Sequence, residues 1–269
     1  MKRNLSVPLI LMLCLTIFST NAFAKDDPKA RAIMQKVDDR ENGDNAISDM
    51  TMILIDKSNN RRVRRIKSYT KDFGVDTYRI MFFQSPADVR NTGFLTYDYD
   101  TFKKDDDQWL YLPALKKTKR IASADKSGSF MGSDFNYSDM NSIDLEDFDY
   151  EIKKEAKLKG HKVWIIQATP RSKEVMEETG YKKGYVYVRK DIYFVVGFKK
   201  WTYDGNYTKT MLVKSLKKID GIWTTQEMHV KKKLGKKVLH QTVMKFNNIK
   251  YNQNLKKSMF TIRRLEKGL

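Results

Sequence analysis

Residues 127–140, with the sequence SGSFMGSDFNYSDM, hold the side chains that come nearest to a site for chemistry in this chain. Asp134 and Asp139 flank two aromatic residues, and acid–base catalysis uses two carboxylates that share a cleft and have separated pKa values. A hydrolase that acts on an envelope lipid or polymer is therefore one hypothesis. The alternative is that both carboxylates accept hydrogen bonds within their own loop, which is common for Asp in turns.

Other signatures of enzymes are absent from the sequence. Gly128 and Gly132 form a Gly-x-x-x-Gly pattern, but the Gly-Lys-Ser/Thr end of a phosphate-binding loop does not follow them. The Gly-x-Ser-x-Gly turn of serine hydrolases does not occur either. We therefore predict that the protein is not an enzyme and needs no cofactor.

Ligands for a transition metal are few. His229 and His240 lie at equal distances from a predicted turn at Leu234-Gly235, so the two imidazoles could meet across a hairpin. Metal sites in proteins usually use three or four ligands, and no third candidate lies nearby in the sequence. We predict no metal site and leave open whether the two histidines pair.

The amino-terminal residues have the features of a secretory signal peptide. A basic start precedes a nearly continuous apolar run over residues 5–18, and an Ala-x-Ala sequence at residues 22–24 offers a cleavage site. The run is shorter than the ~20 residues that a membrane-spanning helix needs. We therefore expect that residues 1–24 are removed, that residues 25–269 form a single domain, and that the protein works in the periplasm of a Gram-negative type of envelope.

The chain is strongly basic, with 52 Lys and Arg against 33 Asp and Glu and a formal net charge of +19. Loss of the two positive charges of Lys2 and Arg3 with the signal peptide leaves +17. Nucleic acid is the usual partner of so basic a chain inside a cell, but export separates the protein from it. We expect contact with an anionic membrane surface instead, where each basic residue near the surface contributes about 1 kcal/mol to binding. Solubility is the simpler role for many of the lysines.

The hydrophobic pattern predicts one helix followed by many strands. Asp27-Pro28 is typical of a helix start, and apolar residues at helical spacing continue the pattern over residues 28–41. Beyond this helix the apolar period changes to two, and turn signals separate many of the alternating runs. We expect about ten to twelve hairpin-linked strands in a sheet that curls or closes. Its clearest strands are residues 49–56, 76–84, 93–99, 108–113, 162–168, 184–189, 193–201, 209–216, 222–230 and 238–246.

Several of these strands are apolar on both faces, as in residues 79–84 and 192–198. One face of such a strand covers a core, and the other face needs an apolar neighbour of its own. A helix packed on the sheet would supply that neighbour, and so would a cavity filled by an apolar ligand.

The segment DDDQWLYLPALKKTKRIASADKSGSFMGSDFNYSDM, residues 105–140, resembles the signature of the outer-membrane lipoprotein-sorting protein family, which is related to the periplasmic Lol-type lipoprotein carriers. The resemblance includes the blocks WLYLP at 109–113, KRI at 119–121 and FMGSDF at 130–135. Upstream, PADVRNTGFLTYDY at 86–99 is similar to the family as well. The signal peptide, the helix and the strands fit the family's layout over essentially all of the mature chain.

The resemblance implies a mainly β protein. Its single curved antiparallel sheet forms an open, unclosed β-barrel, and a few helices cover the concave side. The concave side forms an apolar cavity for acyl chains, which need a carrier because each methylene exposed to water costs about 0.8 kcal/mol. Cys14, the only cysteine, follows Leu13 where lipid attachment needs a small residue, so a soluble shuttle without disulfides is implied. Members of the family are linked to export pumps of the resistance-nodulation-division type, which makes such a pump an implied partner.

The predicted site follows from this layout. Residues 127–140 would form a loop or lid beside the cavity, although their aromatic side chains could equally plug the end of the barrel. A basic group would meet lipid head groups or an acidic partner, with a solvated strand face as the alternative; it consists of Lys116, Lys117, Lys119 and Arg120. The predicted lining or lid residues are Ile33, Met34, Val37, Met52, Leu54, Tyr78, Ile80, Phe82, Leu95, Leu110, Leu112, Phe130, Met131, Phe135, Tyr137, Trp164 and Ile166.

The leading hypothesis is a monomeric periplasmic carrier that binds acyl chains of lipoproteins or lipids and shuttles them toward the outer membrane without covalent chemistry. One alternative is a non-carrying adaptor or sensor of an envelope transport machine, such as an export pump. The third hypothesis is the hydrolase. The sequence leaves the cargo, the direction of transfer and the partner open.

Overall fold

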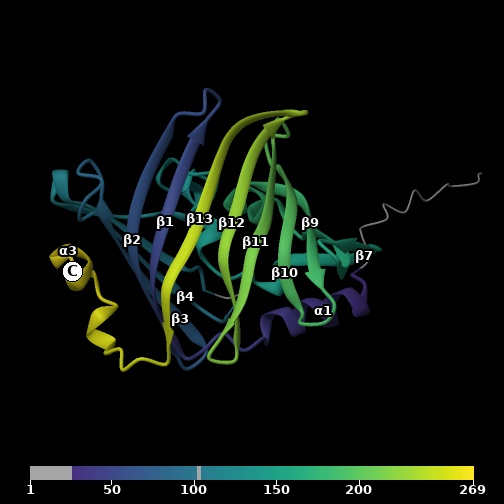
Figure 1. Cartoon of the computed structure of the whole chain (residues 1–269), viewed down its shortest axis with the longest axis horizontal. Coiled ribbons are helices and arrows are strands. Elements are labelled where there is room, and N and C mark those ends of the chain that lie inside the picture. Colours follow the sequence, from purple (N-terminus) through teal and green to yellow (C-terminus); the bar gives the residue numbers. More distant parts are fainter. Residues whose placement is uncertain (1–25, 102–103) are drawn as a thin grey trace, which may run out of the picture.

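The computed structural model describes residues 26–101 and 104–269 (Figure 1), so the predicted signal peptide lies outside the described residues. One sheet dominates the molecule. Its thirteen strands are neighbours in the order β6-β5-β4-β3-β2-β1-β13-β12-β11-β10-β9-β8-β7, and all neighbouring pairs are antiparallel. The strands are β1 (Asn45–Asp56), β2 (Arg61–Phe73), β3 (Asp76–Ser85), β4 (Gly93–Asp98), β5 (Asp107–Leu112), β6 (Lys117–Arg120), β7 (Phe148–Leu158), β8 (His161–Pro170), β9 (Tyr181–Arg189), β10 (Phe194–Thr202), β11 (Thr208–Ile219), β12 (Ile222–Leu234) and β13 (Lys237–Tyr251).

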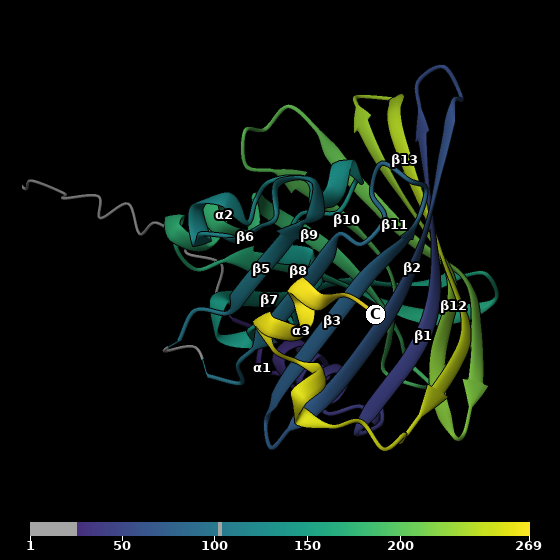
Figure 2. The same ribbon diagram turned by 90° about the vertical axis from the view of Figure 1, so that its left-hand side faces the viewer.

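The sheet is curved but does not close (Figure 2). β1 pairs with β13, so strands from the two ends of the chain lie side by side, while the edge strands β6 and β7 do not pair with each other. The prediction of a single open antiparallel sheet is therefore confirmed. The number of strands exceeds the expected ten to twelve because the charged sequences of β2, β6 and β7 show no clear apolar alternation.

Helix α1 (Pro28–Asp38) packs on the concave side of the sheet against β7 to β9. The Asp27 side chain accepts a hydrogen bond from the backbone N–H of Lys29 (2.9 Å), and Pro28 occupies the first turn, as expected for a helix start. The helix ends at residue 38 rather than at the predicted residue 41. Its buried Ala30, Ile33 and Met34 pack in one cluster with Tyr150 and Val186.

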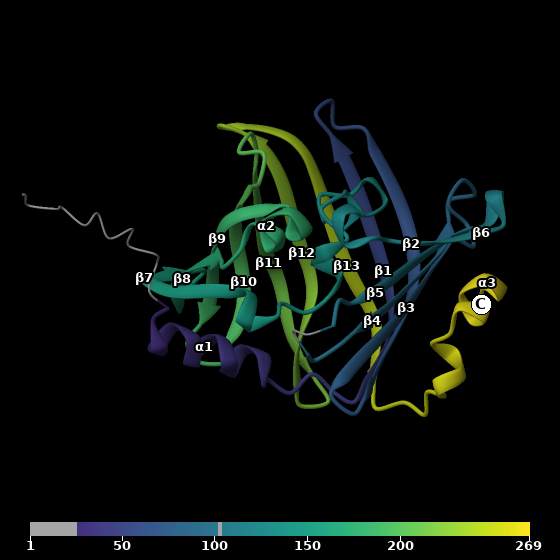
Figure 3. The same cartoon turned by 180° about the vertical axis from the view of Figure 1, so that it is seen from behind.

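A long connection between β6 and β7 also lies on the concave side, together with α2 (Lys173–Thr179) (Figure 3). We call residues 127–140 of this connection the inner loop. Gly180, which ends α2 with φ of 76°, lies so close to the inner loop that an added Cβ would come within 2.8 Å of the Asn136 side-chain nitrogen. The helix and the loop therefore pack as one unit.

Helix α3 (Ile262–Lys267) covers the opposite, outer face of β3 to β5. Its Leu265 and the preceding Phe260 are buried there against Ile80 and Leu95. A Cβ at Gly93 would approach the Leu265 side chain to 2.6 Å, so only glycine permits this contact. β3 to β5 therefore pack against apolar side chains on both faces, and only one of these faces lines the interior of the barrel.

Candidate functional site

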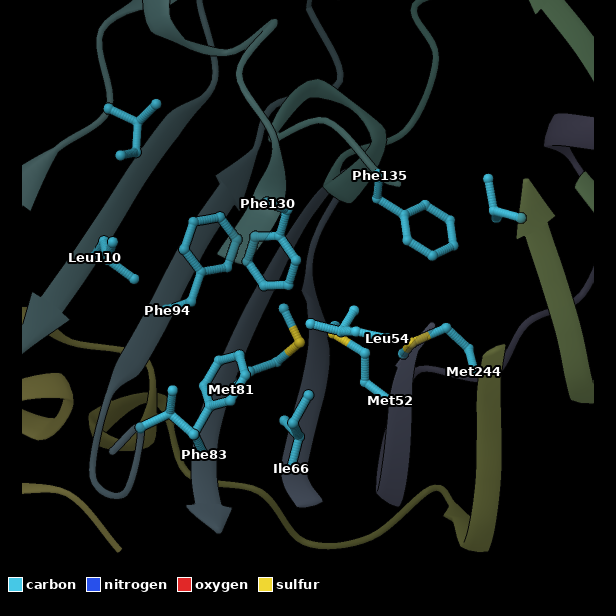
Figure 4. Packing of buried hydrophobic residues seen from close by; sticks show 13 residues of the cluster. Met52, Leu54, Ile66, Met81, Phe83, Phe94, Leu110, Phe130, Phe135 and Met244 are labelled. Atoms are coloured by element: carbon cyan, nitrogen blue, oxygen red, sulfur yellow. The ribbon is translucent and has the colours of Figure 1, made fainter. Parts of the chain in front are cut away.

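The inward-facing side chains of β1, β2, β3, β12 and β13 form an apolar wall (Figure 4). Residues that lie opposite each other in paired strands share a face of the sheet. Met244 lies opposite Met52 on one side and opposite Met228 on the other, and Met50 lies opposite Ile66. The register therefore places a row of methionines on the inside of the barrel.

The inner loop places two aromatic rings over this wall. Phe130 and Phe135 point from the loop toward the strand side chains (Figure 4), and they are 1% and 8% exposed. The Phe130 ring lies 5.0 Å from Phe94 and 5.5 Å from Tyr137, measured between ring centroids. The loop thus fills part of the interior and forms the roof of what remains.

A cavity of about 320 Å³ remains between the inner loop and the wall. Six methionines and three phenylalanines line most of it, and methionine is flexible enough to adapt to ligands of different shape. The volume is about twice that of a ~150 Å³ cavity that holds benzene in another protein. These lining residues are Met50, Met52, Met81, Met140, Met228, Met244, Phe130, Phe135 and Phe246.

Asp139, one of the two carboxylates of the catalytic hypothesis, holds the inner loop in place. It accepts hydrogen bonds from the Tyr181 hydroxyl (2.7 Å) and the Asn136 backbone N–H (2.8 Å), and it forms a salt bridge with Lys200 (3.0 Å). Burial opposes its negative charge, but the two nearby lysines, Lys200 and Lys209, and the two hydrogen bonds together outweigh burial, so the pKa of Asp139 is lowered from its ordinary value. The carboxylate is therefore a charged anchor of the loop.

Asp134 also holds the inner loop in place, by contacts with a different strand. Its carboxylate accepts hydrogen bonds from the Thr242 hydroxyl (2.7 Å) and pairs with His240 Nδ1 (2.8 Å), both on β13. Asp134 and Asp139 thus contact different strands, and neither contacts the other. This arrangement favours the structural interpretation of both carboxylates over the catalytic one.

A second cavity of about 130 Å³ lies between the inner loop, α1 and β7 to β9. Its lining combines apolar residues such as Met34 and Phe148 with several carboxylates. Burial and the neighbouring Asp144 and Glu178 raise the pKa of Asp147 in this lining to about 6. This cavity has a smaller volume than the methionine-lined one, and more carboxylates line it.

The structure brings many of the predicted lining residues together. Met52, Phe130 and Phe135 line the larger cavity, and Met34 lines the smaller one. The apolar cluster around the larger cavity also contains Leu54, Leu110, Leu112, Met131 and Tyr137. The cluster beneath α1 contains Ile33, Val37, Trp164 and Ile166.

Four of the predicted residues lie elsewhere, and this part of the prediction is corrected. Tyr78, Ile80, Phe82 and Leu95 pack on the outer face beneath Phe260 and α3. β3 and β4 carry apolar side chains on both faces, so the alternation alone does not show which face points inward. The inward face of β3 carries Met81 and Arg79 instead.

The sequence interpretation missed most of the methionines and one charged residue. Met50 shares a face with Met52, so the period of two in β1 was sufficient to find it. Met228 and Met244 are brought to the cavity by the pairing of β12 with β13, which local sequence does not specify. The sequence did not indicate that Arg79 faces the cavity, because a charged residue in a strand usually faces water.

The four predicted basic residues lie at the β6 edge of the sheet. Lys119 pairs with Asp125 (3.1 Å) and Arg120 pairs with Asp107 (2.5 Å), and all of these side chains except that of Asp107 are exposed. Lys116 and Lys117 are exposed in the adjoining turn and strand. Contact of this group with head groups or a partner stays a prediction.

His229 and His240 do not pair. His229 lies opposite Val243 and contacts Glu227 (2.6 Å), whereas His240 lies opposite Lys232 and contacts Asp134. Leu234 pairs with Lys237, so the turn is centred on Gly235 and Lys236 rather than on Leu234 and Gly235, and the two histidines are not equally distant from it. A bulge between Lys232 and Lys233 shifts the register by one more residue. Within residues 26–101 and 104–269, no group of three or more His, Cys, Asp or Glu side chains is arranged to hold a metal ion. No helix in the same residues is long and apolar enough to cross a membrane.

Comparison with known proteins places the chain in a family. A family model described as "Uncharacterized protein" matches residues 75–267. The chain belongs to this family. The search of curated proteins found no match.

Solved structures share the fold of this family member over nearly its whole length. A DUF1329 family protein from Desulfovibrio piger is 28% identical with a TM-score of 0.81, and the match covers 90% of this chain and 99% of that one. A Vibrio parahaemolyticus domain assigned to the outer membrane lipoprotein-sorting proteins is 29% identical, with a TM-score of 0.80 and coverage of 88% and 98%. A LolA superfamily protein from Nitrosomonas europaea has a TM-score of 0.67 at 15% identity and coverage of 87% and 98%, which shows the fold. The resemblance to lipoprotein-sorting and LolA-like proteins is thereby confirmed.

Proposed function

We propose that the protein is a periplasmic carrier that binds acyl chains of a lipid or lipoprotein in the methionine-lined cavity and shuttles them toward the outer membrane. The observation that carries this proposal is the cavity of about 320 Å³ between the inner loop and the sheet. Apolar cavities can bind apolar ligands, and burial of each methylene contributes about 0.8 kcal/mol. The similarity to a lipoprotein-sorting domain supports the same function.

The carrier needs no covalent step, because transfer of an acyl chain from water to a cavity is driven by burial alone. The proposal includes export with removal of residues 1–24 and activity of residues 25–269 as one domain and monomer. Its partner for loading or release is a machine of the envelope, and the resemblance points to an export pump of the resistance-nodulation-division type. The exposed Lys116 and Lys117 are the proposed contacts to an anionic membrane or an acidic partner.

The test is native mass spectrometry of protein that was expressed with its signal peptide and purified from the periplasm without detergent. We expect a bound lipid that organic solvent extracts, and saturable uptake of a fluorescent fatty acid after extraction. Phe130→Asp, which places a charge against the chain, should weaken uptake, whereas Phe260→Asp changes the outer face only. A folded protein that carries no lipid and binds no probe would exclude the carrier and favour the adaptor.

A further inference from the structure

The methionine-lined cavity is polar at one end. Along β1, β2 and β3 the inward positions change from apolar to polar in the same direction. Ser48 lies opposite Ser68 on the neighbouring strand, and Thr70 lies opposite Arg79 on the next. All four residues line the cavity, so the apolar space ends at three hydroxyls and a guanidinium.

The guanidinium of Arg79 is only partly used within the protein. Its Nε donates to the Thr70 hydroxyl (3.3 Å) and its Nη1 donates to the Met140 carbonyl (2.5 Å), whereas an arginine has five N–H donors. No Asp or Glu of the described residues forms a salt bridge with Arg79. The carboxylate that acts on it from a longer distance is Asp98, which accepts a hydrogen bond from the Ser142 backbone N–H.

Arg79 is half-buried, so its charge is partly removed from water, which is unfavourable. Removal from water lowers the pKa of Arg79, but arginine stays charged at neutral pH. A charge of this kind is destabilising unless an anion compensates it. Asp139 also lines the cavity, but its negative charge is already balanced by Lys200 and its hydrogen bonds. The described carboxylates therefore leave the charge of Arg79 without a paired anion at this end of the cavity.

We propose that Arg79 binds the anionic head group of a single-chain amphiphile, of which a fatty acid carboxylate is the simplest, while the hydrocarbon chain lies among the methionines. The inference rests on the proposed carrier function and names its ligand class. A planar guanidinium binds a carboxylate through two parallel hydrogen bonds, and the hydroxyls of Ser48 and Ser68 lie on the same end of the cavity. Neither hydroxyl has a hydrogen-bond partner among the described residues.

The size of the cavity agrees with one chain. Its volume of about 320 Å³ is close to twice the ~150 Å³ that accommodates benzene, which corresponds to one chain of about twelve carbons. A lipid with two or more chains would need a wider interior than this resting space.

The experiment compares ligands that share a chain and differ in the head group. Binding of dodecanoate, dodecyl phosphate, 1-dodecanol and dodecylamine to the delipidated protein is measured by displacement of a fluorescent fatty acid. We expect dodecanoate or dodecyl phosphate to bind at least tenfold more tightly than the alcohol, and the amine to bind most weakly. The tighter of the two anions identifies the head group as carboxylate or phosphate.

Arg79→Met should abolish the preference for the anion while binding of the alcohol stays within about twofold of wild type. The matched control is Arg64→Met, because Arg64 also donates to the inner loop, at the Met131 carbonyl, but does not line the cavity. This control should retain the preference.

Equal binding of acid and alcohol by the wild-type protein overturns the inference and leaves the carrier function standing. A preference for the anion that survives in folded Arg79→Met also overturns it. If no ligand of the series displaces the probe and the protein carries no lipid, the carrier function itself fails. The wild-type comparison decides the inference even if Arg79→Met does not fold.

Discussion

Replacement of Phe130 by alanine separates the role of the inner loop in ligand binding from its role in stability. The ring is 1% exposed, and Phe94 and Tyr137 are its aromatic neighbours. Loss of a buried phenylalanine ring costs about 3–5 kcal/mol, and we expect about 3 kcal/mol here because the ring already borders a cavity. A protein of this size should then lose about 6–12 °C in Tm.

The same substitution enlarges the cavity by the volume of the lost ring. If about three additional methylenes occupy that space, their burial at about 0.8 kcal/mol each contributes about 2.4 kcal/mol. This corresponds to a roughly 50-fold lower Kd for a ligand that is three carbons longer. We therefore expect the preferred chain length in Phe130→Ala to shift upward when fatty acids of increasing length are titrated at a temperature well below Tm.

Phe260→Ala is the matched control. Phe260 is also 1% exposed and also contacts another aromatic ring, with a centroid distance of 5.6 Å to Phe73, but it lies on the outer face. It should lower the free energy of unfolding by a similar amount without any change in chain-length preference. The same preference in both folded variants would refute the assignment of Phe130 to the roof of the binding cavity.

Three further predictions concern residues that hold the inner loop, helix α3 and the second cavity in place. Asp139→Asn leaves the half-buried Lys200 without its anion and should cost about 3–5 kcal/mol in urea unfolding, and a loss below about 1 kcal/mol would contradict the anchoring role. Because the pKa of Asp139 is lowered in the folded protein, its contribution to stability is present above its pKa in the unfolded chain and is lost as the pH falls through its pKa in the folded protein. The wild type should therefore lose stability below about pH 4 more steeply than the variant. Gly93→Ala forces Leu265 away and should expose the carboxyl-terminal helix to proteolysis while lipid binding is unchanged; intact protection would show that the helix adapts. Asp147 has a raised pKa of about 6, so its contribution to stability is full below its pKa in the unfolded chain and is lost as the pH rises through 6. The free energy of unfolding of Asp147→Asn should therefore exceed that of the wild type by about 1–2 kcal/mol at pH 8 but not at pH 4. An equal difference at both pH values would exclude this titration.

The sequence predicts the fold well where apolar alternation is strong. The runs at residues 49–56 and 238–246 correspond to β1 and β13, and the predicted helix at residues 28–41 corresponds to α1. Six of the thirteen residues of β2 are Arg or Lys. The pairing of β2 with β1 and β3 therefore determines which of its apolar residues face the interior. Local pattern is therefore a weak guide to a central strand whose other positions are charged.

The candidate site is less predictable from the sequence than the fold. The resemblance of residues 105–140 to a known signature located the inner loop, and its Phe130 and Phe135 line the cavity. Which face of β3 points inward depends on the helix that covers the opposite face, and α3 lies about 180 residues away in the sequence. The inward placement of Arg79 follows from the same choice of face.

The unpaired edges of the sheet determine how the interior can change in size. A closed barrel widens only if hydrogen bonds between strands break, whereas β6 and β7 can move apart with every strand pair intact. The inner loop is bonded to both halves, through Arg64 and Arg79 on one side and through Lys200, Lys209 and Thr242 on the other. If the loop detached from either half, β6 and β7 could separate and the interior could widen to admit a larger ligand without loss of any strand pairing.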